Sequence, residues 1–156
     1  MGGYTTDLRS HHRVFASLTF TDLSYAKLNS ANLSYANLSY ANLSHTDLMV
    51  ANLSDADLSN ADLSNADLTD ANLEYVNLCS CVDHYGYQNG TNLIDANLSD
   101  ADLIHADLSG ANLSGANLSN ADLGGTKLSN VQVTQGQLRQ VNSLKGATMP
   151  DGSKHP

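Results

Sequence analysis

The chain has 156 residues, of which 41% are hydrophobic and 15% are charged, and its formal net charge is −9. This length and composition suit one compact domain. No apolar run approaches the roughly 20 residues of a membrane-spanning helix, and the first residues lack the apolar stretch of a signal peptide. We therefore expect a cytoplasmic protein without a membrane partner. Seven basic residues against sixteen acidic ones argue against direct binding of nucleic acid.

Residues 1–13 are predicted to form a poorly ordered segment or a partial N-terminal coil. The run from Thr6 to Leu8 follows the five-residue phase of the chain that comes after it, whereas the run from His11 to Arg13 breaks that phase. This end of the protein is therefore predicted to be poorly capped, and we expect a homodimer to form through it.

Residues 14–133 repeat one five-residue phrase, which occurs four times in the stretch SDADLSNADLSNADLTDANL at Ser54–Leu73. The centres of the phrases recur every five residues from Leu18 to Val133, and 21 of these 24 positions are Leu. Ala usually lies two residues before the centre, Asn or Asp directly before it, and Ser directly after it. A helix of period 3.6 and a strand of period 2 do not explain a period of five. Each phrase is instead predicted to form one side of a coil, with Leu and Ala pointing inward.

The tandem A-[DN]-L-x-x phrase resembles the pentapeptide-repeat family, and the resemblance covers about Ala16 to Val133. It implies an all-β fold, a right-handed quadrilateral β-helix in which four phrases make one coil. Coils stack at about 4.8 Å, so the repeats would make about six coils and a rod roughly 29 Å long.

The repeat is interrupted at Cys79–Gly90, where Asp83 and Gln88 take two of the central positions. An unpaired buried Asp costs several kcal/mol, so these two sides are expected to bulge outward without inserting any net residues. The bulge is interpreted as a recognition feature or as a tolerated lesion in a redundant array. The side chains that it gathers are His84, Tyr85 and Tyr87.

The same segment contains a candidate chemical site, because Cys79, Cys81 and His84 form a C-x-C-x-x-H run. Structural zinc sites usually have four ligands with C-x-x-C or H-x-x-x-H spacing, and cysteines one residue apart are too close to bridge distant segments. No oxyanion-stabilising group or phosphate-binding glycine loop accompanies the run. We therefore expect that the protein has no metal, no cofactor and no catalytic residue. An enzyme or metal site at Cys79, Cys81 and His84 ranks third among the functional alternatives.

Residues 134–156 are predicted to form a capping helix and a C-terminal tail. Thr134 and Gln137 have the spacing of a capping box, and hydrophobic residues at three-residue spacing after them predict a helix over 135–143. The tail LKGATMPDGSKHP resembles the tail of many cyanobacterial and related bacterial members of the family. This resemblance implies a bacterial source and no particular activity.

Reading every twentieth residue predicts that two neighbouring sides of the rod are acidic and that the other two are rich in amides. Asn and Asp also satisfy backbone groups at corners, which explains why they are frequent but not why they segregate. The carboxylates that mark the predicted acidic sides are Asp62, Asp67, Asp102 and Asp107. The aromatic residues predicted on outward corners, as a contact surface or as a stack, are Phe20, Tyr25, Tyr35 and Tyr40.

These features predict a non-enzymatic protein-binding or scaffold solenoid whose partner is an unidentified protein. The alternative comes from the resemblance, because some pentapeptide-repeat proteins are acidic DNA mimics that modulate DNA gyrase or another type II topoisomerase. The net charge of −9 over the predicted rod is one charge per about 3 Å, against about 1.7 Å in duplex DNA. The mimic is therefore the second interpretation.

Overall fold

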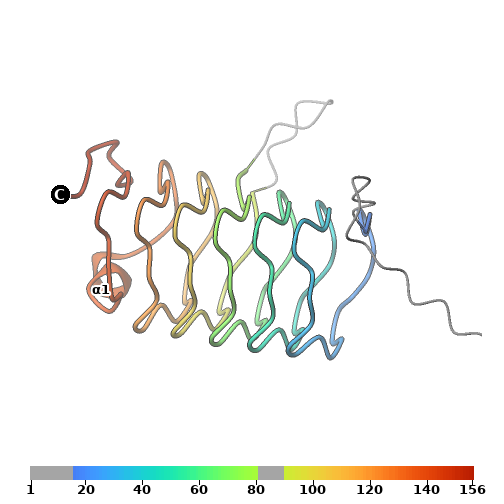
Figure 1. The fold of residues 1–156 in the computed structure, drawn as a ribbon. Helices are drawn as coiled ribbons and strands as arrows, with labels where there is room; N and C mark the ends of the chain where they lie inside the picture. Colours follow the sequence, from blue (N-terminus) through green and yellow to red (C-terminus); the bar gives the residue numbers. More distant parts are fainter. Residues whose placement is uncertain (1–15, 81–89) are drawn as a thin grey trace, which may run out of the picture.

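The structure is a computed structural model that describes residues 16–80 and 90–156. The chain winds into a rod of stacked coils (Figure 1), which isolated parallel bridges hold together. In the N-terminal part these bridges join residues that are 20 apart, such as Ser17 to Asn37 and Asp22 to Asn42. Because each coil contains four bridging residues before the pattern returns, the coil has four sides. The predicted quadrilateral β-helix is confirmed.

We name the sides A to D, and each corner takes the letter of the side before it. Side A carries Ser17, Asn37, Asp57, Asn77, Asp107, Lys127 and Thr148, and side B carries Asp22, Asn42, Asp62, Asn92, Asn112 and Gln132. Side C carries Lys27, Asp47, Asp67, Asn97 and Asn117, and side D carries Asn32, Asn52, Asn72, Asp102, Asp122 and Ser143.

The interior of the rod is filled by the leucine and alanine positions of the repeat. Leu63 and Leu103 are completely buried, and all the described central and alanine positions from Ala36 to Leu128 are buried as well. Burying one Leu contributes about 1.5 to 3 kcal/mol. Where Thr replaces Ala from the second coil onward, its hydroxyl is satisfied by the neighbouring coil, as Thr126 Oγ1 donates to the Leu103 carbonyl at 2.9 Å; in the first coil, Thr21 donates to the Leu18 carbonyl instead.

The corners are tight turns that follow the leucines of the repeat. The N–H of Ala36 donates to the Leu33 carbonyl at 3.0 Å, and Tyr35, the third residue of this turn, has a φ of 61°. A positive φ at this place defines a type II turn, and Gly and Asn adopt it most readily. Val50 adopts the same conformation with a φ of 58°, which is strained for a β-branched residue.

The polar residues on both sides of each leucine form a second turn outside the core. Asn37 Oδ1 accepts the N–H of Ser39 at 3.0 Å and its hydroxyl at 2.7 Å. The same bond from the residue two positions on recurs along the rod, for example from Ser64 to Asp62. The interpretation that Asn and Asp satisfy backbone groups is therefore confirmed.

The interruption of the repeat inserts ten residues, and the expectation that it adds none is wrong. The bridge across it joins Asp62 to Asn92, which are 30 residues apart rather than 20. The chain leaves the coil at corner A, where the Ser80 N–H donates to the Ser109 carbonyl at 2.7 Å. An insertion of two whole phrases keeps the phase of the leucines, which is why the sequence pattern concealed it. Residues 81–89 lie outside the described residues.

Helix α1 (Gln135–Leu138) begins where it was predicted but is shorter than the predicted span of 135–143. Thr134 caps it, and Gln137 completes the predicted capping box. The side-chain amide of Gln137 also donates to the Leu113 carbonyl at 2.6 Å and to the Ala116 carbonyl at 2.9 Å. These two bonds hold the helix in the place that side C would take on the last coil.

The helix ends early because the chain returns to the coil. Ser143 bridges Asp122 on side D, and Thr148 bridges Lys127 on side A. Thr148 then forms an antiparallel bridge with Lys154, so a hairpin covers the edge of side A. In the described ranges no helix is long and apolar enough to cross a bilayer.

Candidate interaction surface

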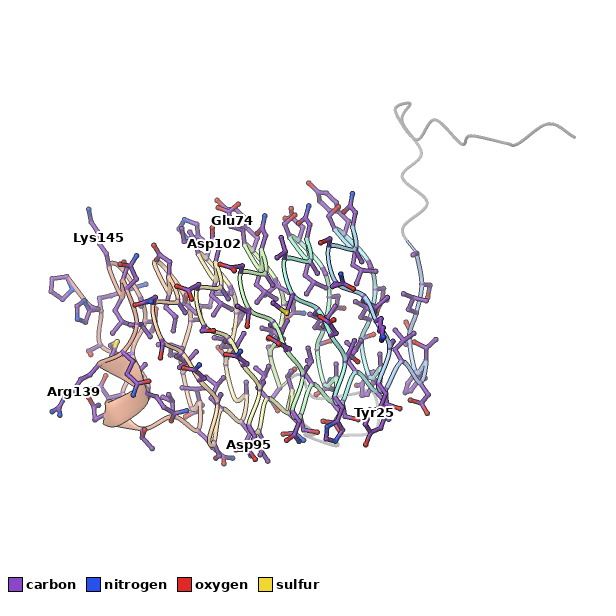
Figure 2. The ribbon with its side chains drawn as sticks, turned by 90° about the horizontal axis from the view of Figure 1, so that it is seen from below. Tyr25, Glu74, Asp95, Asp102, Arg139 and Lys145 are labelled. Carbon is purple, nitrogen blue, oxygen red and sulfur yellow. The ribbon has the colours of Figure 1, made fainter. Side chains whose placement is uncertain are left out.

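Aromatic side chains gather at corners A and B of the first two coils, on either side of side B. Phe20 stacks on Tyr40 with ring centroids 4.8 Å apart, and Tyr25 stacks on His45 at 4.7 Å. The outermost rings are open to solvent, because Phe20 is 74% exposed and Tyr25 is 71% exposed. Figure 2 shows Tyr25 at the surface of the rod. We call these four residues the aromatic corners.

The stacking follows directly from the repeat. Residues at the same corner of successive coils are separated by about one interstrand spacing, 4.8 Å, which is also a favourable distance for offset stacked rings. The same arrangement recurs at corner D, where Tyr75 stacks on His105 at 5.1 Å. Gly125 occupies corner D of the coil after His105. A Cβ at Gly125 would collide with the imidazole ring of His105.

The structure brings together three of the four aromatic residues that the sequence predicted. Phe20, Tyr40 and Tyr25 flank side B, whereas Tyr35 lies on corner D and is 39% exposed. The stacking interpretation is confirmed for Phe20 and Tyr40. Sequence reasoning missed His45, although its position 20 residues after Tyr25 was a sufficient signal once the coil had four sides.

Side B forms a polar strip between the aromatic corners. Asn42 Nδ2 donates to Asp22 Oδ1 at 3.2 Å. The Ser24 hydroxyl and backbone N–H donate to the same carboxylate, and these bonds hold the pKa of Asp22 below its usual range. Asp22 is therefore ionised at neutral pH. The surface combines exposed rings at two corners with a fixed negative charge between them.

The prediction of two acidic sides is wrong, because the insertion moves the later coils by two sides. The four carboxylates lie on four different sides: Asp107 on A, Asp62 on B, Asp67 on C and Asp102 on D. Four of the eight described carboxylates in bridging positions have an amide as their neighbour in the next coil; for example, Asn92 Nδ2 donates to Asp62 Oδ1 at 3.0 Å. An amide in this place satisfies the carboxylate and separates it from further negative charge.

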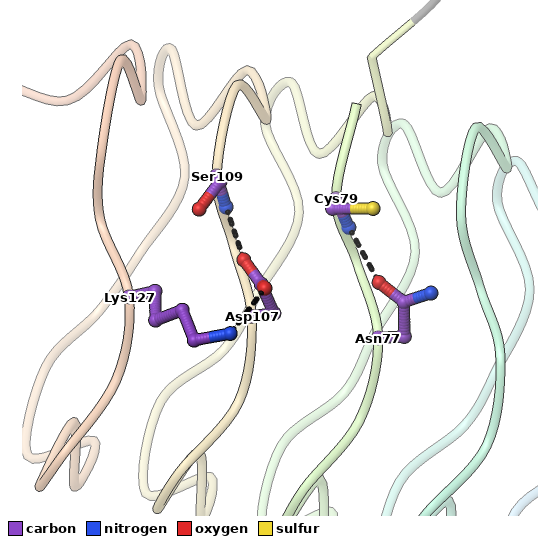
Figure 3. A network of polar contacts seen from close by, with 5 residues as sticks. All are labelled: Asn77, Cys79, Asp107, Ser109 and Lys127. Carbon is purple, nitrogen blue, oxygen red and sulfur yellow. Dashed lines mark hydrogen bonds and ion pairs between the residues drawn. The ribbon is translucent and has the colours of Figure 1, made fainter. Parts of the chain in front are cut away.

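One carboxylate is neutralised by a lysine instead. Asp107 accepts a hydrogen bond from Lys127 at 2.9 Å across the spacing of one coil (Figure 3), the single ion pair within the described residues. Burial raises the pKa of Asp107, but hydrogen bonds from Ser109 and Lys127 outweigh it, so that the pKa lies below its usual value. Residues in bridging positions of adjacent coils are thus close enough for an ion pair.

The segment considered as a chemical site provides no free thiol in the described residues. Cys79 is disulfide-bonded, and its N–H donates to Asn77 Oδ1 at 3.2 Å (Figure 3). Within 16–80 and 90–156, no three His, Cys, Asp or Glu side chains are arranged to hold a metal ion. Four residues named for this segment, Cys81, His84, Tyr85 and Tyr87, lie outside the described residues.

Comparison with known proteins decides the family. A family model described as pentapeptide repeats matches residues 14–49, 51–82, 91–130 and 106–142, with eight copies. The chain belongs to the pentapeptide-repeat family. Proteins of this family form right-handed quadrilateral β-helices, as the resemblance implied. The pentapeptide repeats stop near residue 82 and resume at residue 91, which agrees with the insertion that the bridges reveal.

Several solved pentapeptide-repeat structures are similar to this chain, whereas no curated protein matches it. One from the cyanobacterium Cyanothece 51142 is 44% identical over 55% of this chain and 51% of its own length, with a TM-score of 0.48. This chain thus spans about half of that protein. One from the Arabidopsis thaliana thylakoid lumen is 28% identical, with coverages of 78% and 71% and a TM-score of 0.50. QnrB1, a plasmid-mediated fluoroquinolone resistance protein, is 23% identical, with coverages of 79% and 56% and a TM-score of 0.53, and this likeness shows the fold alone.

Proposed function

We propose that this chain is a non-enzymatic protein-binding scaffold that contacts its partner through side B and the aromatic corners. The observation that carries the proposal is the pair of exposed outer rings, Phe20 and Tyr25, each backed by a second ring on the next coil. Aromatic residues are enriched in protein interfaces and often carry most of the binding energy.

The aromatic corners are also held in place before any partner arrives. The Phe20 N–H donates to the Ser39 carbonyl at 3.2 Å, and the Tyr25 N–H donates to the Ser44 carbonyl at 3.0 Å. The backbone under each exposed ring is therefore fixed to the second coil. A surface that is already ordered loses little conformational entropy on binding, which favours affinity.

The charge of side B indicates the chemistry of the partner. Asp22 carries a negative charge on side B, which the two exposed rings flank, and its hydrogen bonds fix the carboxylate in place. Complementary charge mainly sets the specificity and the rate of association. We therefore expect a protein partner that presents basic side chains between apolar contacts.

Capture from a lysate of the source organism tests this proposal. Bait carrying Phe20→Ser and Tyr40→Ser should lose the partners that wild-type bait retains. Bait carrying Tyr75→Ser is the matched control, because Tyr75 is a stacked corner ring that is 56% exposed and lies on corner D. Equal capture by all three baits would contradict the proposed surface.

The alternative function is an acidic DNA mimic that modulates DNA gyrase. It comes from the family resemblance and the net charge of −9, and the carboxylates that would form its acidic sides are instead distributed over all four sides. A gyrase supercoiling assay separates the two functions. The scaffold should leave supercoiling unchanged at every salt concentration, whereas a mimic would alter it at low micromolar concentration and lose this effect as salt rises.

A further inference from the structure

The two ends of the rod differ in how they are closed. Helix α1 and the hairpin at Thr148–Lys154 cover the C-terminal end. At the N-terminal end the four leucines of the first coil are only partly buried, whereas Leu38 and Leu43 in the next coil are completely buried. We call the surface formed by these four leucines and the outer edge of the first coil the N-terminal face.

At the edge of the N-terminal face, the backbone groups of the bridging residues have no partner within the described part of the chain. In the second coil, Asn42 donates its N–H to Thr21 and accepts the N–H of Leu23. The equivalent N–H and C=O groups of Asp22 and Lys27 have no hydrogen-bond partner among the described residues. The same is true of the other two bridging residues of the first coil, Ser17 and Asn32. A row of unpaired groups at a sheet edge is a template for pairing with another chain.

Symmetry restricts how a second copy can cover this face. A two-fold axis in the plane of the face reverses the direction of every side, so the edges of the two copies would pair antiparallel. A square face has four such axes, and each one places the bridging residues opposite different partners. The bridging residues, in order around the face, are Ser17, Asp22, Lys27 and Asn32.

Charge complementarity selects one of the four axes. The axis through the middle of sides B and D places Asp22 opposite Asp22 of the second copy, and the axis through sides A and C places Lys27 opposite Lys27. The axis through corner A gives neither charge an opposite partner. The axis through corner B exchanges sides B and C, so Asp22 of each copy lies opposite Lys27 of the other.

We propose that this chain forms a head-to-head dimer through the N-terminal face, about the two-fold axis at corner B. The interface contains two Asp22–Lys27 ion pairs and antiparallel contacts between the first coils. The second copy and the partner protein of the proposed function would therefore compete for Asp22 and Tyr25, which both contacts use. A two-fold interface uses the same surface of both copies and closes on itself. Because the C-terminal end of the rod is covered, assembly stops at the dimer.

The structure contains an internal precedent for the ion pair. Lys127 reaches Asp107 at 2.9 Å between bridging positions of adjacent coils, so a lysine side chain can span one interstrand spacing, as Lys27 would have to do to reach Asp22 across the antiparallel interface. Lys27 makes no ion pair within the described part of the chain. The hydrogen bonds that Asp22 accepts there all go to Oδ1, so Oδ2 is available to the second copy.

Tyr25 supports the same axis. It occupies corner B, and His45 covers the face of its ring that points into the rod at 4.7 Å. The opposite face of the ring points toward the N-terminal end, and Tyr25 is 71% exposed. The axis at corner B brings the two Tyr25 residues together, which would extend the stack across the interface.

Sedimentation equilibrium of the full chain, with single and double charge reversals, tests the dimer. Wild type should dimerise in the micromolar range, and Asp22→Lys or Lys27→Asp should each raise the dissociation constant by about tenfold or more, because each creates two like-charge pairs. The double reversal restores opposite charges and should bring the dissociation constant back to within about threefold of wild type.

Two controls keep this test decisive. Asp62→Lys makes the same charge change in the same column, two coils further in, and removes equivalent hydrogen bonds from Ser64 and Asn92; it should leave dimerisation unchanged. Lys27→Asp removes no side-chain hydrogen bond to a described residue, so it tests the interface even if Asp22→Lys unfolds. A wild-type monomer at every concentration, or a double reversal as weak as the single ones, would overturn the proposal.

Discussion

Asp62 lies beside Asn92, thirty residues further along the chain, and the Asn92 amide donates to its carboxylate at 3.0 Å. The equivalent pair one coil earlier, Asn42 and Asp62, is separated by only twenty residues. The bridges on either side of the ten additional residues, from Asp57 to Asn77 and from Asp62 to Asn92, are both formed. The coil therefore does not depend on the inserted segment.

Deleting residues 81–90 should give a regular array that folds. The deletion joins Ser80 to Thr91, which already occupies an alanine position and donates its hydroxyl to the Leu58 carbonyl at 3.1 Å. Shortening the connection should raise the free energy of unfolding by about 1 to 2 kcal/mol, measured by urea denaturation in a Cys79→Ser background. Loss of cooperative unfolding would show that the insertion is needed for the fold.

Stability at the leucine positions should depend on the coil. Leu63→Ala removes a completely buried side chain and should cost about 2 to 5 kcal/mol. Leu33→Ala, in the first coil, changes a partly buried side chain and should cost less. Equal losses in thermal and urea denaturation would show that the N-terminal face is as well covered as the interior.

The strained corner at Val50 can be relieved by a residue that accepts a positive φ. Val50 has a φ of 58° and is 56% exposed, so Val50→Asn should raise the free energy of unfolding by about 1 kcal/mol. The reverse change at an equivalent exposed corner, Asn65→Val, where φ is 57°, should lower it by a similar amount. The account of the corners requires these two effects to have opposite signs.

Asp107 should make the stability of the rod depend on pH. Its pKa lies below the usual value, so the ionised group stabilises the fold above about pH 4, and this stabilisation is lost as the pH falls through the lower, folded-state pKa. Asp107→Asn should therefore lose less stability than wild type between pH 6 and pH 3, measured by urea denaturation. Parallel curves for the two proteins would contradict the role of the Lys127 ion pair.

The local structure could be predicted from the sequence because the same residue types recur at the same positions of the repeat. The Leu63 position, the Asp before it and the Ser after it each have a fixed structural role, so the coil and its turns follow from their spacing. The capping box at Thr134 and Gln137 was likewise readable, because it depends on two residues three apart. The length of helix α1 could not be predicted from the sequence, because the helix ends where Ser143 returns to side D, and this return is a tertiary contact.

The arrangement of the surface was harder to predict for a specific reason. An insertion of ten residues preserves a period of five but moves every later residue by two sides, so Asp102 and Asp107 changed sides without any break in the pattern. The aromatic corners lie before the insertion, and there the period of 20 places Phe20 over Tyr40 correctly. The bridges between coils distinguish these two cases. A side that bulges would leave bridging residues 20 apart, whereas the inserted segment places Asp62 and Asn92 30 apart.

Site-specific photo-crosslinking in the source organism tests the proposed contact surface most directly. A photoreactive phenylalanine would replace Phe20 in one variant and Tyr75 in another, because both are exposed stacked rings on different corners. The scaffold account predicts a discrete adduct with one partner protein at position 20 and none at position 75. An adduct at position 75 alone, or the same adducts at both positions, would contradict it.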